Sequence, residues 1–152
     1  MATPPHVVIY TDGGCDPNPG PGGWAALLRH GKHEKVLSGS EPVSTNNRME
    51  LTAAIQALGA LKGPCQVDLY TDSEYLRRGI SEWLPAWRSR GWKRKGGALA
   101  NLDLWQTLDA LVQQHQVSWH WVRAHAGDRD NARVDALVRQ ARRGRLTPDL
   151  RT

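Results

Sequence analysis

The chain has few of the features that would tie it to a membrane or to an oxidising compartment. No stretch approaches the roughly 20 apolar residues that a membrane span needs, and the first residues contain no apolar signal segment. The two cysteines, Cys15 and Cys65, form no CxxC pair and do not suggest a disulfide framework. We therefore expect a cytoplasmic protein with no membrane association.

Acidic residues are also in short supply, since 20 lysines and arginines stand against 15 aspartates and glutamates and give a net charge of +5. A basic balance favours an acidic partner such as nucleic acid, but the distribution of the charge must decide. The length of 152 residues suits one domain, and no repeat array or linker marks a second. We expect a monomer with a single domain over 1–152, a core at about 6–144 and a short flexible tail at about 145–152.

Two short segments of the chain nearly repeat each other, VIYTDG at 8–13 and DLYTDS at 68–73. Each is an apolar, β-branched and aromatic run that stops on an aspartate, as a strand does when it delivers a carboxylate to its exposed end. If the strands lie side by side, Asp12 and Asp72 come close together. Like charges roughly 4 Å apart repel by about 4 kcal/mol at an effective dielectric near 20, so the pair must hold a proton or a cation. The repeat therefore points to metal chemistry.

The pattern of apolar residues predicts an α/β sandwich around a mixed sheet. The first repeat and the segments 24–29 and 34–39 are predicted to form an antiparallel meander, with the charged third strand at a sheet edge. Apolar residues at three- and four-residue steps predict a helix over 47–61, capped by Thr45 or Asn46. A crossover then makes the strand at 66–71 parallel to the first. The remaining predictions are short helices and a basic loop at 74–95, a helix at 102–112, a strand at 116–122 and a helix at 130–142.

Two further acids lie beside apolar residues on the predicted helices. Glu50 follows Met49 on the first long helix, and Asp135 follows Val134 on the last one. Taken singly, each is explained as well by a surface acid or a helix cap. Together with Asp12 and Asp72 they make four candidate carboxylates, which are harder to dismiss.

Five motifs follow one another along nearly the whole chain: YTDGGC at 10–15, NPGPGG at 18–23, TNNRMEL at 45–51, YTDS at 70–73, and HAG at 125–127 with Asn131 and Asp135 after it. In order and spacing they resemble the bacterial-type ribonuclease H family, type 1. The resemblance implies an RNase H-like fold, with three antiparallel strands and then two parallel to the first, flanked by helices. It also implies an endonuclease that hydrolyses the RNA strand of RNA·DNA hybrids and leaves 5′-phosphate and 3′-hydroxyl ends.

The resemblance further implies a catalytic site with two Mg²⁺ ions, for which Mn²⁺ can substitute, held by Asp12, Glu50, Asp72 and Asp135. One ion would activate the attacking water and the other would stabilise the leaving 3′-oxygen. By family analogy Asp12 bridges the two ions, while Glu50 and Asp72 favour the leaving-group side and Asp135 the water side. His125 would assist proton transfer or product departure. From the residues alone, a solvent-exposed loop histidine is an equal alternative.

Basic residues alternate with tryptophans over 77–95, where seven lysines and arginines accompany one acid and three tryptophans. A solvated helix face explains the charges and a core explains some tryptophans, but a nucleic-acid groove explains both. The segment resembles the family's basic protrusion for the DNA strand, and other positions resemble contacts to the minor groove and 2′-hydroxyls. Helix capping is the alternative for Asn46 and Asn47. The implied substrate-binding residues are Gly14, Cys15, Asn18, Thr45, Asn46, Asn47, Arg48, Trp83, Trp87, Arg88 and Trp92.

Two other functions stay open at this point. One is a non-catalytic hybrid-binding module on the same scaffold, which the presence of all four acids disfavours. The other is a DNA nuclease or strand-transfer enzyme of related architecture, because similar acids recur on similar folds. The chain begins almost directly with its first strand, so we expect no separate hybrid-binding domain. Glu74, Ser89 and Ala132 depart from the family pattern, but none of them is a metal ligand.

Overall fold

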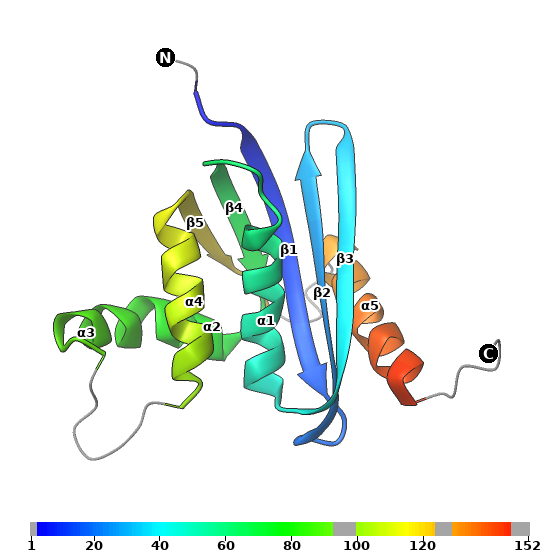
Figure 1. The fold of residues 1–152 in the computed structure, drawn as a ribbon. Coiled ribbons are helices and arrows are strands. Elements are labelled where there is room, and N and C mark those ends of the chain that lie inside the picture. The colour runs from blue at the N-terminus through cyan, green and yellow to red at the C-terminus, as the bar shows by residue number, and fades with distance from the viewer. Residues whose placement is uncertain (1–2, 93–99, 124–128, 147–152) are drawn as a thin grey trace.

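A single mixed sheet organises the protein, which a computed structural model describes at residues 3–92, 100–123 and 129–146. The strands are β1 (His6–Cys15), β2 (Gly20–His30), β3 (His33–Ser44), β4 (Gln66–Thr71) and β5 (Gln116–Trp121). Their order across the sheet is β3-β2-β1-β4-β5 (Figure 1). β1, β2 and β3 pair antiparallel, whereas β4 is parallel to β1 and β5 is parallel to β4. The predicted five-stranded mixed sheet, with β3 at an edge, is confirmed.

Helices cover the two faces of the sheet unequally. They are α1 (Asn46–Gly59), α2 (Glu74–Arg78), the π-helix η1 (Gly79–Trp83), α3 (Leu84–Ser89), α4 (Leu102–Gln113) and α5 (Arg129–Leu146). α1 and α4 pack together on one face, and α5 lies across β1, β2 and β3 on the other (Figure 1). In the part of the chain that the structure describes, no helix is long and apolar enough to span a bilayer.

The main core lies between the sheet and the helices α1 and α4. Alternate strand residues such as Ile9 and Leu69 point into it, and Leu58 and Trp105 meet them from the helices; all four are 0% exposed. Burying one such side chain stabilises the fold by about 1.5–3 kcal/mol. A smaller cluster on the other face joins Leu27 and its neighbours on β2 to α5. The sheet is therefore held from both sides near β1, the strand that carries Asp12.

The boundaries of several elements differ from the predicted ones. β2 begins at Gly20 because the glycine-rich segment, predicted as a turn, pairs with β1 at Gly22 and Gly23. α1 begins at Asn46, with Thr45 as its N-cap: the Thr45 hydroxyl accepts the Arg48 N–H at 3.2 Å. α5 runs to Leu146, inside the tail expected at 145–152; the remainder of that tail lies outside the described residues.

Candidate active site

Asp12 and Asp72 come from neighbouring parallel strands. Tyr10 pairs with Tyr70 in the β1–β4 register, and their rings stack with centroids 4.8 Å apart, so side chains two residues further on share the same face. Asp12 lies in the last half of β1, and Asp72 directly follows β4. The strand pairing predicted from the two repeats thus places both aspartates at one end of the sheet.

Glu50 reaches this end of the sheet because α1 lies directly against β1. A Cβ added at Gly13 would stand 2.4 Å from the carbonyl carbon and oxygen of Met49, so only glycine allows the two backbones to approach this closely. The Ser73 hydroxyl donates a short hydrogen bond to the Glu50 carboxylate. It also accepts the Leu76 N–H at 3.0 Å and caps α2. Ser73 therefore fixes the Glu50 side chain relative to the end of β4.

The sequence analysis did not select Ser73 as a functional residue. The only local signal was a serine placed directly before a predicted helix, which indicates an N-cap and nothing about Glu50. Its link to a carboxylate 23 positions earlier depends on how α1 packs against β1 and β4.

Asp135 arrives from α5, on the opposite face of the sheet from α1. Val134 and Val138 anchor this part of the helix in the smaller cluster, and the side chain of Asp135 is 39% exposed. Arg139, one turn further on, lies 3.4 Å from its carboxylate. Asp135 is close enough to Asp12 for its negative charge to raise the Asp12 pKa.

Mutual repulsion and burial change the acidity of the cluster. Burial raises the pKa of Asp12 from 3.8 to about 8, and the charges of Asp72, Asp135 and Glu50 act in the same direction, against a backbone hydrogen bond from Gly13. Burial likewise raises the pKa of Glu50 to about 7; the Ser73 hydroxyl opposes this change and Asp72 adds to it. All four candidate carboxylates thus belong to one electrostatic cluster, in which burial and neighbouring negative charges favour the protonated form of Asp12 at neutral pH.

The cluster has the donor chemistry of a site for hard divalent cations, since all its ligands are carboxylate oxygens. Within the described residues, no three Asp, Glu, His or Cys side chains are grouped closely enough to hold a metal ion as they stand. His125 lies outside the described residues.

Several of the predicted substrate-binding residues meet in one place beside the acids. The Cys15 N–H donates to the Asn46 side-chain oxygen at 2.7 Å, and the Asn46 N–H donates to the Asn18 side-chain oxygen at 3.0 Å. Gly14 adjoins the same Asn46 oxygen, at 3.5 Å from where a Cβ would stand. We call Gly14, Cys15, Asn18 and Asn46 the asparagine loop cluster. Asn47 is exposed at the start of α1, next to this cluster.

Two predicted substrate-binding arginines are already held by acids of α4. Arg48 donates to Asp103 at 2.9 and 3.1 Å and to the Asn101 side chain at 3.2 Å. Arg88 donates to Asp109 at 2.6 and 2.9 Å. Each arginine therefore joins α4 to a neighbouring helix, and would have to leave its acid to bind a phosphate through the same nitrogens.

The tryptophans of the basic segment at 77–95 pack against the interior of the protein and do not lie on an open surface. Trp83, Trp87 and Trp92 are half-buried and pack against the main core, and the ring of Trp87 meets that of Trp105 with centroids 5.6 Å apart. Arg77 pairs with Glu74 at 3.2 Å on the exposed surface. Residues 93–99, with three of the seven predicted cations, lie outside the described part of the chain.

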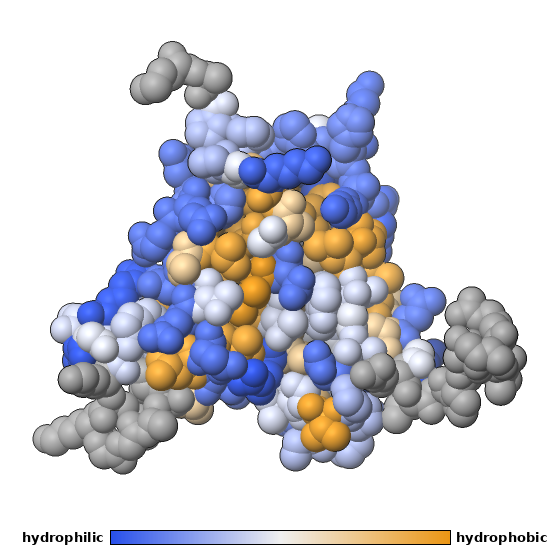
Figure 2. Space-filling model, viewed as in Figure 1, coloured by the Kyte–Doolittle hydropathy of each residue, from blue (hydrophilic) through white to orange (hydrophobic). Residues whose placement is uncertain are grey.

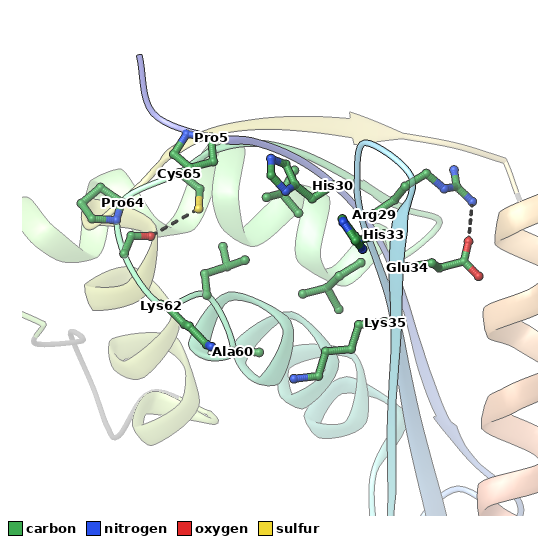
Figure 3. Close-up of a pocket in the computed structure, with 14 residues that line it drawn as sticks. Pro5, Arg29, His30, His33, Glu34, Lys35, Ala60, Lys62, Pro64 and Cys65 are labelled. Atoms are coloured by element: carbon green, nitrogen blue, oxygen red, sulfur yellow. Dashed lines mark hydrogen bonds and ion pairs between the residues drawn. The ribbon is translucent and has the colours of Figure 1, made fainter. Parts of the chain in front are cut away.

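A separate cavity of about 650 Å³ lies at the end of the sheet opposite to the acids. Figure 3 shows the residues that line it. Val7, Leu28 and Leu61 contribute to its apolar lining, and Figure 2 shows apolar surface bordered by hydrophilic residues on this side of the molecule. None of the predicted site residues lines it. It is therefore distinct from the acid cluster.

The fold and the cluster define an α/β protein with a carboxylate centre suited to divalent cations. The RNase H family model matches residues 4–143, and the chain belongs to that family. It is 60% identical over 135 residues to the ribonuclease H of Halorhodospira halophila, covering 88% of this chain and 91% of that one. Since its curated relatives are ribonucleases H, the protein is an enzyme of the nuclease class.

Two solved structures extend the comparison. LC9-RNase H1, described as a type 1 RNase H with the type 2 active-site motif, superposes with a TM-score of 0.84 at 36% identity, covering 95% of this chain and 75% of that one. LC11-RNase H1, solved in complex with an RNA/DNA hybrid, superposes with a TM-score of 0.70 at 24% identity, covering 93% and 99%. At that identity the second likeness shows the fold alone.

Proposed function

We propose that the enzyme is an endonuclease that hydrolyses the RNA strand of RNA·DNA hybrids with two divalent cations, leaving 5′-phosphate and 3′-hydroxyl ends. The observation that carries the proposal is the convergence of four carboxylate charges, from β1, α1, the end of β4 and α5, in a chain of the RNase H family. The curated relatives named ribonuclease H, 60% and 58% identical to this chain, support the substrate class. Mg²⁺ is the proposed cofactor, and Mn²⁺ the substitute.

In this mechanism Asp12, Glu50, Asp72 and Asp135 would hold the cations, which supply the positive charge that an in-line displacement at phosphorus requires. Ser73 orients Glu50 by the hydroxyl hydrogen bond. The Gly13 N–H, which favours the ionised form of Asp12, works against the protonation that burial imposes. His125 is proposed to assist proton transfer or product departure. Ser73 thus orients Glu50, and the hydrogen bonds from Gly13 and Ser73 favour the ionised carboxylates that cation binding requires.

Recognition of a hybrid requires contacts that distinguish ribose from deoxyribose, and only the 2′-hydroxyl provides them. We propose that the asparagine loop cluster reads the RNA strand, because it joins backbone and amide groups directly beyond Asp12 on β1. Thr45, Asn47 and the half-buried Trp83, Trp87 and Trp92 would contact the hybrid around it. Little dependence on base sequence follows, since amide groups accept and donate at any groove edge.

We further propose that the enzyme acts as a cytoplasmic monomer. Both cysteines are free thiols, Cys65 buried and Cys15 partly so, which is consistent with a reducing compartment. Gel filtration with light scattering tests the oligomeric state: a mass near 17 kDa supports the monomer, and twice that mass contradicts it.

Hydrolysis of one oligonucleotide sequence, presented as RNA·DNA, RNA·RNA, DNA·DNA and single strand, tests the function. With Mg²⁺ we expect cleavage of the RNA in the hybrid alone, and none in EDTA. Cleavage of duplex DNA but not of the hybrid would instead favour a DNA nuclease of related architecture. Tight hybrid binding without cleavage in Mg²⁺ or Mn²⁺ would indicate a non-catalytic binding module.

A further inference from the structure

Arg142 lies on the last helix at a position that the sequence analysis did not select. Residues 135, 139 and 142 follow one another at steps of four and three and so share one face of α5. Asp135, at one end of this row, belongs to the acid cluster. At the other end, a Cβ built on Gly14 would stand 3.8 Å from the Arg142 Nη1 atom. The guanidinium thus lies at the asparagine loop cluster, about two helical turns along α5 from Asp135.

The packing of α5 on β2 fixes the backbone of Arg142. A Cβ at Gly23 would stand 2.7 Å from the Val138 carbonyl oxygen and 3.2 Å from the Arg142 nitrogen, so glycine lets the helix lie directly on the strand. Val138 is buried in the smaller apolar cluster. The packing therefore fixes the backbone position from which the Arg142 side chain extends toward β1.

Arg142 differs from Arg133 and Arg139 on α5 in forming no ion pair with a described acid. Arg139 pairs with Asp135 at 3.4 Å, and Arg133 pairs with Glu34 at 2.8 Å. Among the described residues, no carboxylate forms an ion pair with Arg142, although its side chain is half-buried. Burial raises the pKa of the Cys15 thiol, while a Gly20 backbone hydrogen bond and the charge of Arg142 lower it. The positive charge is thus directed at the loop and is not neutralised there.

We propose that Arg142 binds a phosphate of the RNA strand, next to the nucleotide read by Gly14 and Cys15. A guanidinium donates two parallel hydrogen bonds to a phosphate, and such contacts hold the register of a nucleic acid without reading its bases. α5 and the α2–α3 arm lie on opposite sides of the molecule (Figure 1). Arg142 would hold the RNA from the α5 side. This inference rests on the proposed function, since it needs RNA in the site.

Steady-state kinetics with a short RNA·DNA hybrid in Mg²⁺, over a series of KCl concentrations, test the proposal. The variants are R142A, R142K and the matched control R143A, which removes the same charge from the exposed neighbour on α5. We expect R142A to raise KM roughly three- to tenfold with kcat within about twofold, as for loss of one ion contact. The slope of log KM against log KCl concentration should fall by about 0.9, as for one phosphate contact on a duplex. R142K should retain much of the wild-type KM, and R143A nearly all of it.

A change in the RNA itself tests which strand is bound. In one set of substrates the RNA strand carries one deoxynucleotide followed by a neutral methylphosphonate linkage, and in a second set the DNA strand carries such a linkage. Each is compared with the same strand bearing an ordinary phosphate. At one linkage near the cleavage site, we expect neutralisation to raise the KM of the wild type but not that of R142A. If that linkage is found in the DNA strand instead, the assignment to RNA is wrong.

The outcomes separate this inference from the function on which it rests. If the wild type does not cleave the hybrid, the proposed function fails. If the wild type cleaves it and R142A matches R143A in KM and salt dependence, the function stands and the role of Arg142 fails. A lower melting temperature of R142A with unchanged KM would show a structural role only, and would also overturn the proposal.

Discussion

Two groups of acids in this protein have opposite electrostatic surroundings. Near the β2–β3 hairpin, Glu34 and Asp130 accept hydrogen bonds from Arg29 and Arg133, and these bonds lower the pKa of Glu34 to about 2. In the site, acids face other acids, and burial raises the pKa of Asp12 to about 8. The paired group favours the folded state at neutral pH, whereas the acid cluster opposes folding unless it holds protons or cations. Unfavourable charge repulsion is thus concentrated in the acid cluster that we propose to bind the cations.

The change with the largest expected effect is D12N, which removes the most strongly shifted acid of the cluster. We expect the Mg²⁺-dependent hydrolysis rate to fall by at least about a thousandfold, since electrostatic groups at a reacting centre contribute on this scale. Binding of the hybrid, followed by fluorescence anisotropy, should persist. The matched variant D130N removes an acid from the paired group and should stay within a fewfold of the wild-type rate; an active D12N would contradict the assignment.

The stability of the metal-free enzyme should depend on pH in a direction set by Asp12. Its folded-state pKa of about 8 exceeds the ordinary 3.8, so the folded protein binds this proton more tightly than the unfolded chain does. The contribution of Asp12 to stability therefore rises as the pH falls from about 8 toward 4. Thermal unfolding in EDTA should show D12N to be more stable than the wild type at pH 8, by several degrees. Equal melting temperatures there would contradict the raised pKa.

S73A should have an intermediate effect, because it frees Glu50 and removes the cap of α2. We expect kcat to fall roughly tenfold while KM changes little, and stability to fall by about 1 kcal/mol. The matched control is S89A, since the Ser89 hydroxyl donates to the Ala86 carbonyl at 3.0 Å and lies away from Glu50. If S73A keeps the wild-type kcat and shows only the loss of stability, Ser73 acts as a cap alone.

E34Q should produce the smallest effect, since Glu34 is an exposed acid. Its pKa is lowered in the folded state, so its contribution to stability is present above about pH 4.5 and is lost as the pH falls toward 2. We expect melting temperatures about 1–3 °C lower at pH 7, converging with the wild type near pH 2. The difference in melting temperature between variant and wild type should change with pH in opposite directions for E34Q and D12N, which would establish the contrast between the two groups of acids. A change in the same direction for both variants would contradict it.

The sequence predicted the mixed five-stranded sheet, because strand and helix patterns extend over whole elements; the roles of the four acids stay a prediction. The repeat at 8–13 and 68–73 placed Asp12 and Asp72 on paired parallel strands, which the register confirms. The extension of β2 back to Gly20 was missed because glycine and proline usually indicate a turn. Here the glycines instead allow close approach of β1, α1 and α5.

Long-range side-chain partners could not be predicted from local patterns. Ser73 with Glu50, Arg48 with Asp103 and Arg88 with Asp109 each join residues more than 20 positions apart. The cation-rich composition of residues 77–95 did not reveal that Arg88 meets Asp109 of α4. Conversely, Arg142 looked like one more exposed basic residue of a charged helix, and only the packing of α5 on Gly23 shows where it points.

Calorimetric titration of Mg²⁺ or Mn²⁺ at pH 7, in two buffers of different ionisation enthalpy and with hybrid whose RNA cannot be cleaved, tests the central claim most directly. The electrostatics of the acid cluster predict cation uptake coupled to proton release by the wild type, with both reduced in D12N. Absence of cation uptake by the wild-type complex, or uptake without proton release, would contradict the account.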